Sequence, residues 1–169
     1  MSDTVQDDEH GQRMSDEEMV QRLRAARLRV TQPRLMVLRV LNRKNRHLSA
    51  DDILAELRAH QAPLPRASVY NILGTFVVCG IAAVTDAGPG RTLYEIAGRW
   101  HHHFVCRECG RIIDVPCVVG ESPCLVPDEI DAEVDTAQVI FRGRCRTCID
   151  AEKSAALSGT VHGQVASSS

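Results

Sequence analysis

Aromatic residues are scarce in this chain of 169 residues, which contains one Trp, two Tyr and three Phe. Apolar residues still make up 44% of the sequence, so we expect a core of ordinary size that is mostly aliphatic. Long apolar runs are missing as well, and none approaches the roughly 20 residues of a transmembrane helix. The composition therefore excludes a membrane-spanning protein, and the length suits one domain or two small ones.

A secretory signal is also missing, since the first 18 residues are acidic and polar. We therefore expect a cytoplasmic protein with no membrane partner. Disulfides are rare in the cytosol, so the seven cysteines favour metal binding or redox sensing.

The net charge of −2 conceals an uneven distribution. Residues 20–71 carry eleven Arg or Lys against three Asp or Glu, a net of +8. Residues 1–18 carry one Arg against seven Asp or Glu, a net charge of −6. A basic segment is typical of nucleic-acid binding. Alternatively, the basic residues simply cover solvent-exposed helix faces. Charge alone does not distinguish this from a nucleic-acid-binding surface.

Helix signals follow one another in the N-terminal half. Ser15 and Glu18 form the pattern of a capping box, and Thr31 and Ser49 can cap a second and a third helix. A fourth helix with apolar residues at helical spacing ends at Gly80. Two short β-forming segments around the turn sequence "DAGPG" then predict a hairpin. This order is that of a winged helix, whose last helix enters the DNA major groove.

The segments "HHFVC", "RIIDV" and "AQVIFRG" predict strands of a second, small α/β unit. The predicted fold class is therefore α+β. We expect a winged-helix domain over residues 15–97 and the second domain over 98–150. The acidic segment 1–14 and the segment 151–169, which is poor in large apolar residues, are predicted to be disordered.

Four cysteines form two Cys-x-x-Cys pairs that are separated by 35 residues. Each pair makes a tight turn in which the sulfurs converge, so two pairs can present four thiolates tetrahedrally to a structural Zn²⁺. Redox dithiols or unrelated buried cysteines are the alternative. The predicted zinc ligands are Cys106, Cys109, Cys145 and Cys148.

Three consecutive histidines precede the first of these pairs. In a strand, His101 and His103 share one face and His102 points to the other. Asp114 on the next predicted strand can join the first two, and such nitrogen and oxygen ligands suit Fe²⁺, Mn²⁺, Zn²⁺ or Ni²⁺. The further candidate ligands are Glu95, at the end of the hairpin, and His47, which taken alone is more typical of a surface residue.

The order of these motifs resembles the ferric uptake regulator family of metal-dependent transcription factors. The resemblance covers residues 15–148 and rests on "HLSADDI", "RASVYNIL", "HHHFVCRECGRIID" and "CRTC". It implies a homodimeric repressor of palindromic double-stranded operator DNA, which is not an enzyme and has no small-molecule substrate. It also implies that the second domain is the dimerisation domain and that a regulatory Fe²⁺ or Mn²⁺ accompanies the structural zinc.

Residue by residue, the resemblance implies two sets of functional side chains. The implied ligands of the regulatory metal, at the hinge between the domains, are His47, Glu95, His101, His103 and Asp114. The implied DNA contacts are Arg34, Arg66, Ser68, Tyr70 and Asn71, with surface packing as the alternative for the tyrosine.

A few positions distinguish the peroxide-sensing members of the family from the iron-sensing ones. Asp114 and Asn71 resemble peroxide-sensing members, whereas Glu95 resembles iron-sensing ones. The segment "CVVGESPCL" is similar to an actinobacterial subgroup that represses catalase-peroxidase genes. We therefore predict a repressor that responds to peroxide through iron-catalysed oxidation of His47 or His101. An iron- or zinc-responsive uptake repressor of the same family is the alternative.

Two other protein classes fit the sequence less well. A hydrolytic metalloenzyme needs a general base beside an open zinc, and no clear candidate is present. A zinc-ribbon interaction protein has no need of the basic helical half. Outside the quartet, Cys79 falls on a buried helix face, whereas Cys117 and Cys124 flank a loop and are candidate redox thiols.

One variant of the family carries a third metal site, which the resemblance implies to be incomplete in this chain. Trp100 and Ala137 stand where that site uses histidines, although His102 and Glu121 remain. The sequence thus favours two metal sites.

Overall fold

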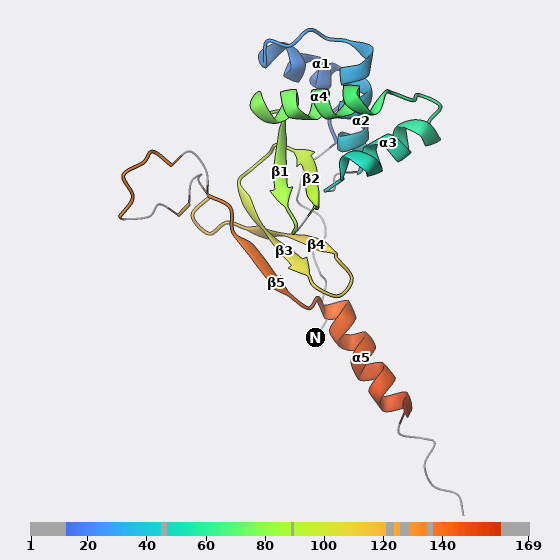
Figure 1. Cartoon of the computed structure of the whole chain (residues 1–169), viewed down its shortest axis with the longest axis vertical. Helices are drawn as coiled ribbons and strands as arrows, with labels where there is room; N and C mark the ends of the chain where they lie inside the picture. Colours follow the sequence, from blue (N-terminus) through green and yellow to red (C-terminus); the bar gives the residue numbers. More distant parts are fainter. Residues whose placement is uncertain are drawn as a thin grey trace, which may run out of the picture. The chain divides into compact units, whose positions relative to one another are not determined.

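The computed structural model describes residues 13–44, 47–88, 90–120, 124–125, 129–134 and 137–159. The chain divides into two compact units, residues 1–99 and residues 100–169, close to the predicted boundary at 97/98. Among the described residues, the first unit holds four helices and a hairpin, and the second holds a small sheet and a helix (Figure 1). The predicted α+β class is confirmed.

The first unit has the order of elements that the sequence predicts. Its elements are α1 (Asp16–Ala25), α2 (Gln32–Lys44), α3 (Ala50–Ala59), α4 (Arg66–Val78), β1 (Ala82–Asp86) and β2 (Thr92–Ile96). The two strands pair antiparallel, with Val84 opposite Tyr94. Arg22 of α1 ties the helices to the hairpin, because its guanidinium donates to the carbonyl oxygens of Ile81 and Ala97.

Reciprocal capping starts two of these helices. Ser15 N–H donates to Glu18 Oε2 at 2.6 Å, and Glu18 N–H donates to Ser15 Oγ at 3.3 Å. Ser49 and Asp52 repeat the arrangement at 2.9 and 3.1 Å. Each box satisfies backbone donors that the first helical turn leaves without partners. Both capping predictions are therefore confirmed.

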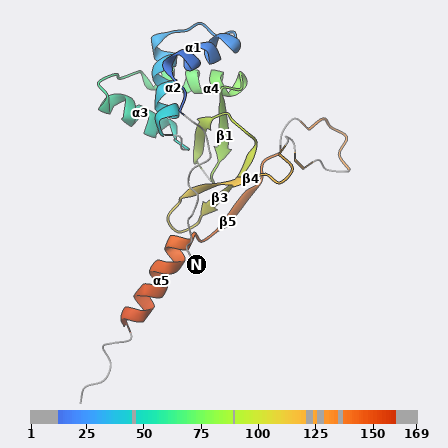
Figure 2. The ribbon, with the colours of Figure 1, turned by 180° about the vertical axis from the view of Figure 1, so that it is seen from behind.

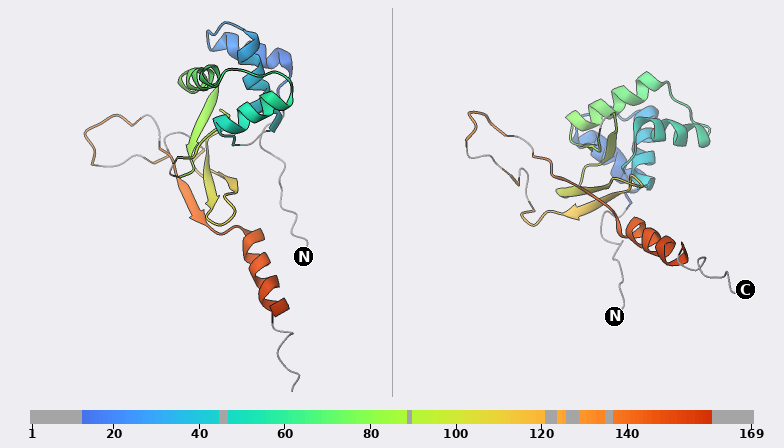
Figure 3. Two further views of the ribbon diagram at one scale, coloured as in Figure 1. Left: turned by 45° about the vertical axis from the view of Figure 1, so that its right-hand side comes forward. Right: turned by 60° about the horizontal axis from the view of Figure 1, so that its bottom comes forward.

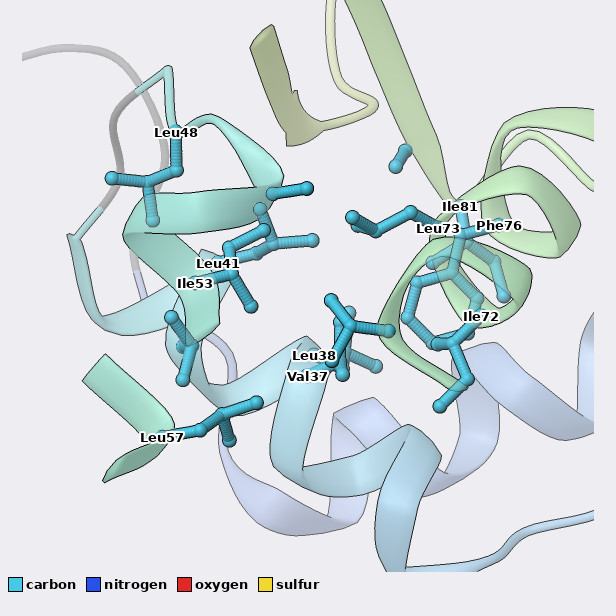
Figure 4. Close-up of a cluster of buried hydrophobic side chains, with 14 of the residues drawn as sticks. Val37, Leu38, Leu41, Leu48, Ile53, Leu57, Ile72, Leu73, Phe76 and Ile81 are labelled. Atoms are coloured by element: carbon cyan, nitrogen blue, oxygen red, sulfur yellow. The ribbon is translucent and has the colours of Figure 1, made fainter. Parts of the chain in front are cut away.

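The core of the first unit is aliphatic, as its composition predicts, with a single phenylalanine among its buried residues. Figure 4 shows side chains from α2, α3 and α4 in this cluster, including Phe76, whose exposed fraction is 0%. The other labelled residues are Val37, Leu38, Leu41, Leu48, Ile53, Leu57, Ile72, Leu73 and Ile81. This packing fixes the orientation of α4, the helix that the sequence assigns to DNA.

The second unit is a three-stranded sheet followed by a helix. Its elements are β3 (His101–Cys106), β4 (Ile112–Pro116), β5 (Ile140–Gly143) and α5 (Arg146–Gly159). The strand order is β4-β3-β5, so β3 lies in the middle (Figure 2). β3 runs antiparallel to β4, which places His103 opposite Asp114, and parallel to β5.

The predicted tails need two corrections. Residues 1–12 lie outside the described residues, but Met14 is ordered: its N–H donates to Asn42 Oδ1 at 2.9 Å, and Asn42 Nδ2 donates to its carbonyl oxygen at 2.7 Å. For the C-terminal segment, the prediction of disorder from residue 151 onward is wrong for residues 151–159. These residues belong to α5, which extends away from the sheet (Figure 3). Good helix formers and the Arg146–Asp150 ion pair at 2.9 Å support this helix. Residues 160–169 lie outside the described residues.

Of the helices that the structure describes, none combines the length and the apolar character needed to traverse a lipid bilayer.

Candidate metal and DNA-binding sites

The four cysteines of the two Cys-x-x-Cys pairs meet in the second unit, with all four sulfur atoms within 4.8 Å of one another. Cys106 Sγ lies 3.8 Å from Cys148 Sγ, and Cys109 Sγ lies 3.7 Å from Cys145 Sγ. Four sulfurs at about 2.3 Å from a tetrahedral zinc are about 3.8 Å apart. The quartet therefore has the dimensions of a closed zinc site.

The backbone brings the two pairs together from opposite ends of the unit. Cys106 ends β3, and the turn after it closes when Gly110 N–H donates to the Cys106 carbonyl at 2.9 Å. The parallel pairing of Cys106 with Gly143 brings in Cys145, and Cys148 lies in the first turn of α5. The parallel strands β3 and β5 thus end side by side, and the four sulfurs lie beside these ends.

The local environment makes the thiols unequal before any metal binds. Hydrogen bonds from the backbone N–H groups of Cys109 and Cys145 lower the pKa of Cys106 to about 6. The hydrogen bonds of Cys148 with Cys145 and Cys109 raise the pKa of Cys148 above its usual value. One sulfur is thus prepared as a thiolate, whereas another must release its proton when a metal binds.

Strand geometry separates the three histidines as predicted. The ring centroids of His101 and His103 lie 4.7 Å apart on one face of β3, while His102 contacts Trp100 and Phe141. Asp114 joins the first two from β4, with Oδ1 at 3.8 Å from His101 Nε2. Two imidazoles and a carboxylate are therefore gathered in the second unit, within 4.8 Å of one another.

The first unit gathers the other two predicted ligands through a backbone bridge. Leu48 N–H donates to the Tyr94 carbonyl at 2.9 Å, and Tyr94 N–H donates to the Leu48 carbonyl at 2.8 Å. The residues next to this bridge, His47 and Glu95, are thereby adjacent, with Nε2 and Oε2 3.2 Å apart. The histidine that looked least convincing in sequence is thus paired with a carboxylate.

The predicted DNA contacts, four on α4 and Arg34 on α2, fall into two groups. Arg34, Ser68 and Asn71 line one open groove of the first unit. Its full lining is Arg29, Thr31, Pro33, Arg34, Ser68, Asn71 and Ile72. Sequence reasoning missed Arg29, although it belongs to the basic segment, because nothing in the spacing links it to α4.

Arg66 and Tyr70 form the second group, one turn apart on the exposed side of α4. Arg66 Nη2 donates to Tyr70 Oη at 3.0 Å, and the guanidinium carbon lies 5.2 Å from the centre of the tyrosine ring. Asp51 holds the same guanidinium at 2.6 Å and raises the pKa of Arg66. The helix starts at Pro65 without a side-chain cap or an acidic first turn, which leaves its positive end available to an anion.

A model of the ferric uptake regulator family matches residues 25–118, more than half of the chain. The chain belongs to the ferric uptake regulator family. It is 37% identical over 130 residues to "Transcriptional regulator FurA" of Mycobacterium tuberculosis, which covers 76% of this chain and 88% of that protein. The family is one of transcriptional regulators, so the prediction that the chain is not an enzyme is confirmed.

Two further members show the range of the family. The chain is 29% identical over 135 residues to "Peroxide-responsive repressor PerR" of Staphylococcus aureus, covering 79% of this chain and 91% of that protein. The structure of the ferric uptake regulator from Pseudomonas aeruginosa with manganese matches at a TM-score of 0.58 and 26% identity, covering 76% of this chain and 98% of that one. The predicted nearness to peroxide-responsive members is not confirmed, because the mycobacterial protein is more similar.

Replacement of one cysteine of the quartet should release the ion and loosen the second unit. We expect Cys145→Ser to lower bound zinc by about one equivalent per chain and to unfold at lower temperature, because structural zinc contributes folding energy directly. Elemental analysis and thermal unfolding measure the two effects. Cys79→Ser, outside the quartet, is the control, and equal loss of zinc in both variants would contradict the assignment.

Two arginine variants test the groove. Arg34→Ala and Arg24→Ala change the net charge equally, but only Arg34 lines the groove. We expect Arg34→Ala to weaken operator binding by about tenfold and to reduce the salt slope by about one, because a phosphate contact is lost. Fluorescence anisotropy over a salt series measures both quantities. Equal effects of the two variants would show that only overall charge matters.

Proposed function

We propose that the chain is a metal-dependent DNA-binding repressor that uses His47, Glu95, His101, His103 and Asp114 as the ligands of a regulatory Fe²⁺ or Mn²⁺. The observation that carries the proposal is that each unit gathers its own share of this ligand set. The first supplies an imidazole and a carboxylate that are 3.2 Å apart. The second supplies two imidazoles and a carboxylate that share one face of a sheet.

The donor atoms fit such a metal. All five side chains offer imidazole nitrogen or carboxylate oxygen, a mixture that suits borderline divalent ions. The P. aeruginosa relative was solved with manganese. A metal that draws ligands from both units binds best when the DNA-binding unit has one particular arrangement, and it thereby shifts the population toward that arrangement. The affinity of the protein for DNA then depends on the concentration of the metal.

The cysteine quartet has a different role in this proposal. Its sulfur separations match a tetrahedral Zn²⁺, and four thiolates close the coordination shell, so this ion is structural and takes no part in sensing. It joins the end of β3 to the start of α5. The regulatory ligands on β3 then rest on a strand whose end is held in place.

We assign DNA recognition to α4 and its surroundings. Ser68 and Asn71 are one turn apart and face the groove that Arg29 and Arg34 also line. An asparagine can bind adenine through two hydrogen bonds, and arginines bind phosphate or guanine. The uncapped start of α4 adds a favourable place for a phosphate.

A homodimer on a palindromic operator follows from the same assignment, because symmetric half-sites match a twofold protein. The second unit is suited to pairing. Its sheet has two edge strands, β4 and β5, and the apolar side chains of Ile113 and Phe141 on them are 43% and 47% exposed. Exposed edges and apolar side chains of this kind favour association with a second sheet.

Within the family, the repressor can respond either to the concentration of its metal or to peroxide. The comparisons favour the concentration of the metal. The chain is more similar to FurA than to PerR. Peroxide is the second candidate, because Asp114 resembles peroxide-sensing members and a PerR protein is among the relatives. Bound iron would supply Fenton chemistry with peroxide as the oxidant, and this chemistry would add oxygen to an adjacent imidazole. His47 and His101 are then the residues at risk, and the loss of either weakens metal binding.

Two histidine variants test the metal dependence. We expect His101→Ala to lower metal-dependent DNA affinity at least tenfold, because one of the nitrogen ligands is lost. His60→Ala is the matched control, since His60 contacts Glu56 at 3.7 Å and is outside the ligand set. Binding is measured with Mn²⁺ and with a chelator. DNA affinity that is equal with both in the unmodified protein would exclude a metal-dependent repressor.

Peptide mass spectrometry separates metal sensing from peroxide sensing. The Fe²⁺-loaded and Mn²⁺-loaded proteins are each exposed briefly to low peroxide. If metal level is the signal, we expect unmodified histidines in both samples and unchanged DNA affinity. An added oxygen on His47 or His101 in the iron sample alone would instead establish peroxide sensing.

A further inference from the structure

A third group of metal-ligating side chains lies in the second unit, apart from the quartet and the regulatory ligands. It consists of His102, Cys117 and Cys124, whose ligand atoms lie within 4.8 Å of one another. His102 Nε2 is 3.6 Å from Cys124 Sγ. One imidazole and two thiols thus converge at a point that the proposed function does not use.

The strand pairing explains how the chain brings these residues together. His102 lies opposite Val115 across the β3–β4 pair. Cys117 directly follows Pro116, the last residue of β4, and therefore emerges beside the start of β3. Gly120 has a φ of 80°, a conformation that favours glycine and turns the chain soon after Cys117.

Aromatic rings flank His102, and its Nε2 makes a hydrogen-bond contact with Cys124 Sγ at 3.6 Å. The rings of Trp100 and Phe141 lie nearly edge-on, with centroids at 6.4 and 6.3 Å from the imidazole. Nδ1 of His102 is buried and, among the residues that the structure describes, has no hydrogen-bond partner. Nε2, the nitrogen that faces Cys124 Sγ, is therefore the atom of this ring that is placed to bind an ion.

The two thiols are placed for metal binding as well. Both sulfurs lie within 4.8 Å of each other and of the ligand atom of His102. Sulfur is the ligand that thiophilic ions prefer.

We propose that His102, Cys117 and Cys124 form a third metal site, which takes a thiophilic ion, Zn²⁺ or Cu⁺. Thiolates select such ions over Mn²⁺, which prefers oxygen. A tetrahedral ion with three protein ligands keeps its fourth position open, unlike the ion of the closed quartet. Because His102 points away from His101 and His103, this site and the regulatory ligands occupy opposite faces of β3.

This site differs from the incomplete third site that the family resemblance implies. The missing histidines at Trp100 and Ala137 concern a site of nitrogen and oxygen ligands, and Glu121 lies outside the described residues. The structure instead gathers two sulfurs around His102. The change of ligand type shifts the preference of the site away from Fe²⁺ and Mn²⁺ and toward Zn²⁺ or Cu⁺.

Cobalt tests the site directly, because a thiolate ligand gives Co²⁺ a charge-transfer band in the near ultraviolet. The reduced protein, with zinc retained in the quartet, is titrated with Co²⁺ in the absence of oxygen. The regulatory ligands contain no sulfur, so they give no such band. We expect the band in the unmodified protein and in Cys79→Ser, and its loss in Cys117→Ser/Cys124→Ser. His102→Ala should weaken Co²⁺ binding at least tenfold.

Differential alkylation provides a second measurement that needs no variant. Zn²⁺ or Cu⁺ is added separately to the reduced protein, and alkylation of Cys117 and Cys124 is followed by peptide mass spectrometry, with Cys79 as the reference. Protection of both thiols supports the site, and the ion that protects at the lower free concentration is its preferred occupant. Equal alkylation with and without either ion, or a cobalt band that survives in the double variant, would overturn the proposal. So would a His102→Ala variant that binds Co²⁺ as tightly as the unmodified protein.

Discussion

The alternation of side chains along β3 is the constraint on which the chemistry of the second unit depends. A strand sends successive residues to opposite faces, so three adjacent histidines cannot act as one cluster. His101 and His103 face Asp114, whereas His102 faces Cys124. The same strand ends in Cys106, a member of the quartet. One strand of six residues therefore contributes to three groups of ligands, and a shift of one residue in its pairing with β4 would exchange two of them.

The parallel pairing of β3 with β5 determines that the two Cys-x-x-Cys pairs meet. Parallel neighbours need a long connection, and here Cys109 and Cys145 are separated by 35 residues. Ordering so long a connection costs conformational entropy, which an ion bound by the four cysteines helps to offset. Gly143 belongs to this arrangement, since a Cβ atom there would lie 3.1 Å from the ring of Phe104. The strand partner of Cys106 is thus a position where little space is left for a side chain.

In the first unit, one short backbone bridge connects the helices to the hairpin. The Leu48–Tyr94 bridge holds the segment before α3 against β2, and His47 and Glu95 come together beside it. α3 and α4 share the core around Phe76. Packed side chains therefore join α3, which begins shortly after His47, to the helix that carries Ser68 and Asn71.

The sequence alone predicted the elements of the first unit and the strands of the second. It also predicted the helix starts at Ser15 and Ser49, the convergence of the four cysteines and the division of the histidines between two faces. These features depend on local spacing, which can be read along the chain. It misjudged the segment after residue 151, because a helix with few large apolar residues gives a weak signal. From the residues alone, it left the carboxylate partner of His47, the position of Arg29 and the grouping of His102 with Cys117 and Cys124 unresolved. These contacts join residues that are far apart in sequence, and only tertiary structure decides them, because backbone pairing and core packing determine which distant side chains meet.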